Sequence, residues 1–94
     1  MQIQNYRAVK QFIAREPKAE APMKHWQQTV LDHNWANGAQ VLQTFNKADC
    51  VSQDKWVFNI GGDNYRLVAM VWFESKVVHV LKVMTHQEYD KEVF

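Results

Sequence analysis

Residues able to do acid–base chemistry on a phosphate gather in the C-terminal half of the chain. The segment THQEYD, residues 85–90, follows a strand-like run directly, so its side chains can reach back across the end of a sheet. His86 can titrate near neutral pH and Tyr89 can donate or accept a proton, while Arg66 and Lys82 can hold a phosphate and stabilise charge in its transition state. These are the parts of a metal-independent ribonuclease.

In that reaction a base takes the proton of a 2′-hydroxyl, the oxygen attacks the adjacent phosphorus, and an acid protonates the leaving 5′-oxygen. Each residue also has a purely structural interpretation. Arg66 can pair with a carboxylate such as Asp63 or Asp90. The other side chains can be solvated sheet residues or ordinary strand-end residues: Lys55, Lys82, His86 and Tyr89.

The strands that would position these residues follow Asp54. Residues 56–60, 65–73 and 77–85 are rich in β-branched and aromatic side chains, and GGDN and ESK separate them as turns. Facing residues of antiparallel strands share a face of the sheet, so we expect Asn59 opposite Arg66 and Val68 opposite Lys82. The same register pairs Phe73 with Val77 across the second turn.

Strand parity then divides the sheet into two faces. The first is almost wholly apolar and is the predicted core face, comprising Trp56, Phe58, Ile60, Leu67, Ala69, Val71, Phe73, Leu81 and Val83. The second, the predicted open face, carries Lys55, Asn59, Arg66 and Lys82 among Val57, Val68, Met70, Trp72, Val78 and Val80. His79 falls on the core side by parity, and Trp72 on the open side can stack a base or be covered by a partner.

Helical spacing of apolar residues precedes the strands, from Asn5 to about Phe45. We expect one helix capped by Asn5 and ended by Pro17, and a second with Pro22 in its first turn. Asn37-Gly38 would close the second helix, residues 39–45 would form a third, and residues 1–4 a short edge strand. Helices followed by a meander of strands predict an α+β fold with the helices on one face of an antiparallel sheet.

Length and composition narrow the function. Ninety-four residues predict one domain, 1–94, and a net charge of +1 argues against a protein that coats nucleic acid by bulk electrostatics. The single cysteine favours a reducing, cytoplasmic setting, and the longest apolar run, residues 67–73, is too short to cross a membrane. We expect no cofactor and no metal site, because His25, His33 and Cys50 stand in no metal-binding pattern.

Two stretches, DKWVFNIGGDNYRLVA at residues 54–69 and VMTHQEYD at residues 83–90, resemble the HigB toxins of type II toxin–antitoxin pairs, within the RelE/ParE-like superfamily. The resemblance runs from about Pro22 to Asp90. It implies a compact RelE-like α+β toxin that cleaves mRNA on the ribosome, in the A site of the 30S subunit, and is neutralised by a HigA-type helix-turn-helix antitoxin.

The resemblance also assigns roles to residues. Arg66 would bind the phosphate from the central strand, and His86, Tyr89 and Asp90 would supply the proton-transfer groups. RelE-type relatives carry lysines on the strand before this arginine, where Val57 and Asn59 stand here, so phosphate stabilisation would fall to Lys55, Lys82 or both. Lys55, Asn59 and Trp72 are the candidate RNA-binding residues.

Two other functions fit parts of the same pattern. One is a ParE-like toxin that blocks DNA gyrase without cutting RNA. The other is a non-catalytic binding module, in which Trp72 and Met70 on the open face form only a partner surface. Cleaved mRNA in expressing cells would separate the nuclease from both.

Overall fold

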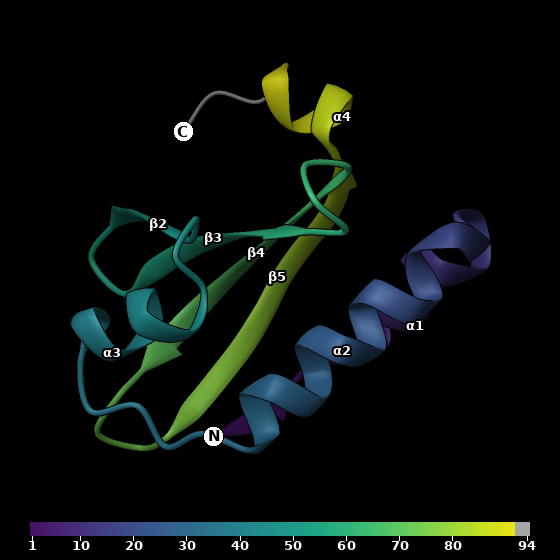
Figure 1. Ribbon diagram of the computed structural model, residues 1–94. Helices are drawn as coiled ribbons and strands as arrows, with labels where there is room; N and C mark the ends of the chain where they lie inside the picture. The colour runs from purple at the N-terminus through teal and green to yellow at the C-terminus, as the bar shows by residue number, and fades with distance from the viewer. Residues whose placement is uncertain (92–94) are drawn as a thin grey trace.

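The computed structural model describes residues 1–91 as a five-stranded sheet with helices between its first two strands in the sequence and after its last (Figure 1). The strand order is β1-β5-β4-β3-β2; the pairings β2–β3, β3–β4 and β4–β5 are antiparallel, whereas β1 joins β5 in parallel. The elements in chain order are β1 (Gln2–Gln4), α1 (Arg7–Arg15), the 3-10 turn η1 (Pro17–Ala19), α2 (Glu20–Leu31), α3 (Gly38–Thr44), β2 (Asp49–Ser52), β3 (Lys55–Ile60), β4 (Tyr65–Trp72), β5 (Val77–Thr85) and α4 (His86–Asp90). The predicted α+β fold is confirmed.

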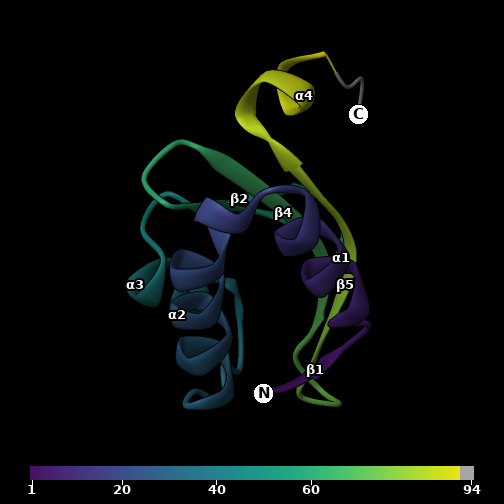
Figure 2. The same ribbon diagram turned by 90° about the vertical axis from the view of Figure 1, so that its right-hand side faces the viewer.

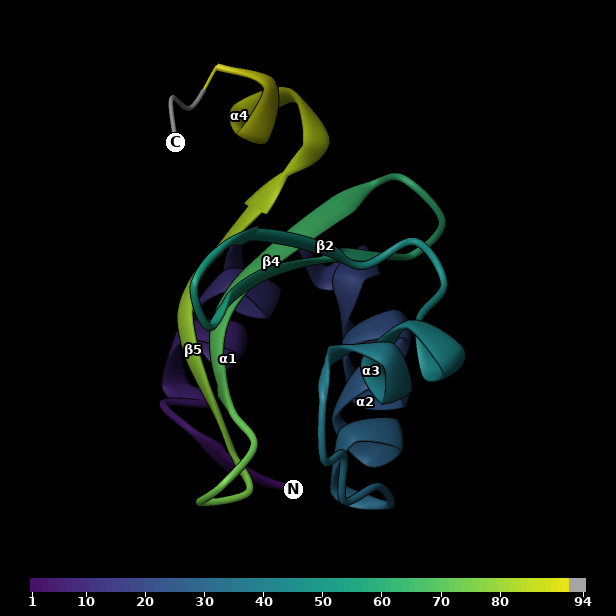
Figure 3. The ribbon, with the colours of Figure 1, turned by 90° about the vertical axis from the view of Figure 1, so that its left-hand side faces the viewer.

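The main core lies between α1, α2, α3 and one face of the sheet. Phe58 of β3 is fully buried and meets Trp26 of α2 and Phe45 after α3 edge-to-face, with ring centroids 5.6 and 5.4 Å apart. Such aromatic pairs bury large apolar areas in a defined geometry. Helix α1 packs along β5, as Figure 2 and Figure 3 show from opposite sides. Helix α4 instead stands at the opposite end of the molecule from the N-terminus (Figure 1).

The register of the sheet matches the prediction around Arg66 and departs from it farther along. Asn59 pairs with Arg66, and Val68 with Lys82, as expected. A β-bulge between Lys82 and Val80 then shifts the pairing, so that Val77 lies opposite Trp72 and not opposite Phe73. A bulge inserts one unpaired residue into one strand and reverses the facing of every residue beyond it.

The bulge overturns four parity predictions on β5. Val78 and Val80, expected on the open face, are fully buried in the main core. Leu81, expected in the core, is the extra residue and is 43% exposed. His79 was expected in the core but is half-buried, and its Nδ1 lies 3.0 Å from the side-chain oxygen of Gln4.

Asn5 and Asn37 were predicted to cap the first helix and to close the second, and both predictions were wrong. Asn5 does not cap α1: it adopts a left-handed conformation with φ +62°, and its side-chain amide donates to the Val80 carbonyl at the bulge. Asn37 does not close α2, which ends at Leu31, but caps α3 by accepting a hydrogen bond from the Gln40 amide. Both side chains satisfy backbone groups, one across the sheet and one at the start of the next helix.

The predicted roles of the prolines and of the edge strand are confirmed. Helix α1 ends at Arg15, ahead of Pro17, and Pro22 lies in the first turn of α2. Strand β1 lies at the edge of the sheet, although its parallel pairing was not foreseen. No helix within residues 1–91 is long and apolar enough to span a bilayer.

Candidate functional site

Arg66 of β4 lies at the centre of the candidate site. Its Nη1 donates to the carbonyls of Asp63, at 2.8 Å, and Tyr65, at 3.1 Å, which holds the side chain toward the turn between β3 and β4. These acceptors are backbone oxygens and not the carboxylates that the structural interpretation proposed. Within residues 1–91 the side chain makes no hydrogen bond through Nε or Nη2, so N–H donors remain for a bound anion.

Helix α4 brings the titratable segment to this end of the sheet. It begins with a capping box: the Thr85 hydroxyl accepts from the Glu88 amide at 3.1 Å, and Glu88 Oε1 accepts from the Thr85 amide at 2.9 Å. The His86 amide also donates to the Asn64 carbonyl at 2.9 Å, which ties α4 to the β3–β4 turn. The segment therefore forms a helix and not a strand end, and the Thr-x-x-Glu spacing was the signal for it in the sequence.

Tyr89 closes the face of the sheet that the sequence predicted to be open. Its ring packs against a second small core of Val57, Val68 and Met84, each 2% exposed. The Arg66 guanidinium carbon lies 5.8 Å from the centre of the same ring, within the range of a cation–π contact. The prediction that Val57 and Val68 lie on an open surface was therefore wrong, because Tyr89 and half-buried Val51 cover them.

His86 and Asp90 lie together on the outside of α4. Nδ1 of His86 is 3.8 Å from Oδ2 of Asp90, and the two side chains are 45% and 68% exposed. The separation is longer than a hydrogen bond. An exposed imidazole beside a carboxylate suits proton transfer to and from a bound substrate.

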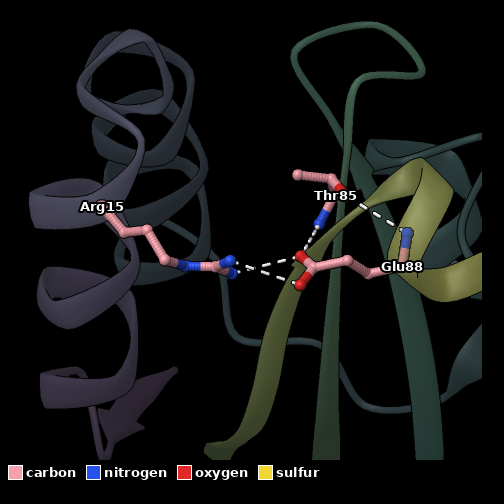
Figure 4. Close-up of polar contacts among 3 residues, drawn as sticks. All are labelled: Arg15, Thr85 and Glu88. Carbon is pink, nitrogen blue, oxygen red and sulfur yellow. Dashed lines mark hydrogen bonds and ion pairs between the residues drawn. The ribbon is translucent and has the colours of Figure 1, made fainter.

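The pKa of Glu88 falls from its ordinary value of 4.5 to about 2. The first cause is the hydrogen bonding to Arg15, whose Nη2 and Nη1 donate to Oε1 and Oε2 at 3.1 and 3.3 Å (Figure 4). The second cause is the amide of Thr85 in the capping box. The same pairing raises the pKa of Arg15. Glu88 thus stays ionised over the whole range in which proteins normally work.

Asn59 and Lys82 flank Arg66 on neighbouring strands. Half-buried Asn59 lies opposite Arg66 and lines a cleft of about 390 Å³ with the Gly61-Gly62 turn. His25 and Thr29 of α2 also line this cleft. Lys82 is diagonal to Arg66, since its partner Val68 is two residues away, and it lies at the exposed edge beside α1. Diagonal neighbours in an antiparallel sheet lie about 7–8 Å apart, within reach of long side chains.

Lys55 and Trp72 lie farther from Arg66 than the sequence interpretation required. Lys55 pairs with Met70, four residues along β4 from Arg66, or about 13 Å at the usual rise per residue. Trp72 is six residues along, about 20 Å away, and packs against His79 with ring centroids 5.8 Å apart. The structure therefore brings together Arg66, Asn59, Tyr89 and the start of α4, and leaves Lys55 and Trp72 at a distance.

No group of three or more metal-binding side chains occurs among the described residues. Cys50 is an exposed free thiol on β2. The groups near Arg66 include side chains that can exchange protons or donate hydrogen bonds, so the chemistry open to them is acid–base catalysis with charge stabilisation.

A protein-family model for the RelE-like toxic component of a toxin–antitoxin system, named HigB toxin, matches residues 19–92. The match covers most of the chain and every candidate site residue named above. This chain belongs to the HigB toxin family. The α+β architecture with a central antiparallel sheet agrees with the RelE-like fold that this membership implies.

Curated HigB relatives match a shorter segment. The chain is 57% identical over 35 residues to the mRNA interferase toxin HigB of Escherichia coli K12, a match that spans 37% of this chain and 34% of that protein. The mRNA interferase HigB of Escherichia coli O157:H7 and that of Shigella flexneri match with the same identity and coverage. The aligned segment is about a third of the length of these relatives.

Proposed function

We propose that this HigB-family chain is an mRNA interferase, a metal-independent endoribonuclease that cleaves mRNA and so stops translation and growth. The observation that supports the proposal is the approach of Arg66 to α4: the guanidinium carbon lies 5.8 Å from the centre of the Tyr89 ring, and His86 and Asp90 belong to the same short helix. The name of the curated relatives, mRNA interferase, supports the same activity.

In the proposed reaction a base takes the proton of the 2′-hydroxyl as its oxygen forms a bond to the adjacent phosphorus. The bond from phosphorus to the 5′-oxygen breaks, an acid gives that oxygen a proton, and a cyclic phosphate remains on the upstream fragment. The free N–H donors of Arg66 would stabilise the charge that builds on the phosphoryl oxygens. His86 is the proton-transfer group in this scheme, and Asp90 orients it; Tyr89 holds the guanidinium and is the alternative acid or base.

The RNA would cross the sheet end beside Asn59. This side chain shares the face of Arg66 and also lines the 390 Å³ cleft, so its amide can bond a nucleotide next to the phosphate. Lys82 would supply a second cation close to Arg66. A longer RNA would also reach Lys55 and Trp72, which lie about four and six residues along β4 from Arg66. Lys55 would contact a phosphate through its charge, and Trp72 would stack on a base.

The low net charge of the chain supports the ribosome as a partner. A net charge of +1 gives little attraction for free RNA, so a carrier that presents the message would remove the need for it. We propose that the ribosome is this carrier, with the toxin acting at the A site of the 30S subunit.

Membership of a toxin–antitoxin family implies an antitoxin, and we propose a HigA-type helix-turn-helix protein.

The deciding experiment maps RNA 5′ ends in cells that express the chain or its Arg66→Ala variant. The proposal expects new ends within coding sequences and arrested growth for the wild type, and neither for the variant. Arg7→Ala, an exposed arginine at the start of α1, serves as a matched control and should remain toxic. Arrested growth without new 5′ ends, accompanied by loss of DNA supercoiling, would support the ParE-like gyrase inhibitor instead.

A further inference from the structure

An ion pair joins α1 to α4 beside the proposed site. Arg15 is the last residue of α1 and Glu88 lies in α4, 73 positions later, yet their fork-like contact uses both carboxylate oxygens (Figure 4). We propose that Arg15 and Glu88 are positioning residues, which fix α4 so that His86 and Tyr89 face the phosphate bound by Arg66. The inference rests on the proposed ribonuclease function and adds to it two residues that touch no reacting atom.

Helix α4 needs such an attachment because it is short. Five residues make little more than one turn, and isolated helices of this length are unstable in water. Among the contacts within residues 1–91, the His86 amide on the Asn64 carbonyl holds its start, and the Tyr89 ring on the small core holds its inner side. Glu88 adds a contact toward α1.

Glu88 couples the folding of α4 to its orientation. One oxygen, Oε1, accepts both from the Thr85 amide, which caps the helix, and from Arg15 Nη2. A single carboxylate therefore completes the capping box and also orients the helix. A bidentate arginine contact also fixes direction better than a lysine contact can, since the guanidinium presents two parallel N–H groups.

The Arg15 side of the contact is itself held by the main core. The guanidinium lies over the Phe12 ring, 5.1 Å from its centre, and Phe12 is 4% exposed. The Phe12 ring in turn meets Tyr65 edge-to-face at 5.6 Å, and Tyr65 is the residue before Arg66. The same packed aromatic pair therefore supports both the residue that holds α4 and the strand that carries Arg66.

This geometry gives a kinetic signature. Misplacing a catalytic group by about 1 Å can slow a reaction by as much as ~100-fold without weakening substrate binding. Loss of either Arg15 or Glu88 should therefore lower the cleavage rate at saturating ribosome concentration. The ribosome concentration that gives half of this rate should not change. If Arg15 were instead a direct RNA contact, removal of Glu88 would free it and would maintain or increase RNA affinity.

The test uses the full chain and ribosomes carrying a defined mRNA, with single-turnover cleavage measured against ribosome concentration. The variants are Arg15→Met, Glu88→Gln and the double variant; Gln can still serve in the capping box, so Glu88→Gln removes mainly the ion pair. We expect each single variant to cleave roughly 10-fold to 100-fold more slowly at saturation, and the double variant to be no slower than either, because one interaction is lost in all three.

Arg15→Lys and Arg7→Met complete the series. The lysine keeps the charge without the bidentate geometry, so an intermediate rate is expected, and it remains informative if Arg15→Met folds poorly. Arg7→Met removes another exposed α1 cation and should cleave at the wild-type rate. Hydrogen exchange of the α4 backbone amides should become faster in the Arg15 and Glu88 variants and not in Arg7→Met.

Three results would overturn the inference. The first is wild-type rates in both single variants, and the second is additive losses in the double variant. The third is slower cleavage by Arg15→Met with unchanged or faster cleavage by Glu88→Gln, which would make Arg15 an RNA contact. A wild-type chain that cleaves nothing would overturn the proposed function itself. The three results above all require an active wild type, so they are distinct from that outcome.

Discussion

Arg66 and Tyr89 meet at the end of the sheet, with the guanidinium carbon 5.8 Å from the centre of the tyrosine ring. Arg66 comes from the middle of the antiparallel sheet, whereas Tyr89 comes from a one-turn helix after the last strand. The same ring covers Val57, Val68 and Met84, so the position of Arg66 is tied to the burial of a small core. The proposed phosphate-binding residue and the small core therefore contact the same Tyr89 ring.

The first prediction separates the ring of Tyr89 from its hydroxyl. Tyr89→Phe keeps the ring beside Arg66, so we expect cleavage within roughly three-fold of wild type, since the cation–π contact survives. Tyr89→Ala uncovers the small core and should cost about 1–2 kcal/mol of stability, less than a fully buried aromatic because Tyr89 is only half-buried. Its cleavage rate should fall further than the loss of folded protein explains. A Tyr89→Phe protein that folds normally but cleaves nothing would make the hydroxyl the acid or base.

The second prediction concerns the pH dependence of cleavage. With His86 as the proton-transfer group, the pH profile of the wild-type cleavage rate should contain a limb that His86→Gln removes. Asp90→Asn should retain the limb and lower the rate, because the residue orients His86 without exchanging the proton. Single-turnover rates from pH 5 to 9 on the purified variants measure both. An unchanged profile in His86→Gln would move the role to another group.

Much of this site was predictable from strand parity. The pairings of Asn59 with Arg66 and of Val68 with Lys82 follow from turn position and side-chain alternation, and both occur. The helical form of α4 was also readable, since Thr85 and Glu88 have capping-box spacing and the box is present. Local rules succeed here because each depends on residues close in sequence or joined by a tight turn.

Long-range contacts account for the errors. The bulge at Leu81 coincides with the Asn5 amide bonding the Val80 carbonyl and with β1 pairing only as far as His79. The sequence of β5 itself indicates neither contact, so the simplest expectation is a regular strand in which successive side chains point to opposite faces. The contact of Arg15 with Glu88 is likewise invisible, because it joins residues 73 positions apart that each look like solvated surface charges.

The third prediction tests the packing of α3 on the sheet. Gly38 lies against Trp56, and a Cβ added to it would come 2.9 Å from Cζ2 of the indole, closer than the buried ring can accept. Gly38→Ala should therefore destabilise the fold by about 1–3 kcal/mol, as overpacking of a core does. Thermal or urea unfolding measures the loss. Trp56→Phe provides room, so the double variant should lose less than the sum of the two single variants; strict additivity would contradict the steric explanation.

The fourth prediction gives the contact of Arg15 with Glu88 a pH signature in stability. The folded state holds the pKa of Glu88 at about 2, below its ordinary value of 4.5, so the ionised form favours folding. This contribution is fully present above about pH 4.5 and is lost as pH falls toward 2. The melting temperature of wild type should exceed that of Glu88→Gln by a constant amount near neutral pH, and the difference should narrow below pH 4.5 and vanish near pH 2.

The size of this difference should be small, because both side chains are about half exposed and water screens their attraction. Added salt should therefore reduce it at neutral pH. Glu74→Gln, which changes an exposed carboxylate in the turn between β4 and β5, is the matched control and shows how much of the difference comes from removing one surface charge. A difference for Glu88→Gln that does not change with pH would mean that the charge of Glu88 does not stabilise the fold and that its ion pair with Arg15 contributes nothing to the hold on this helix.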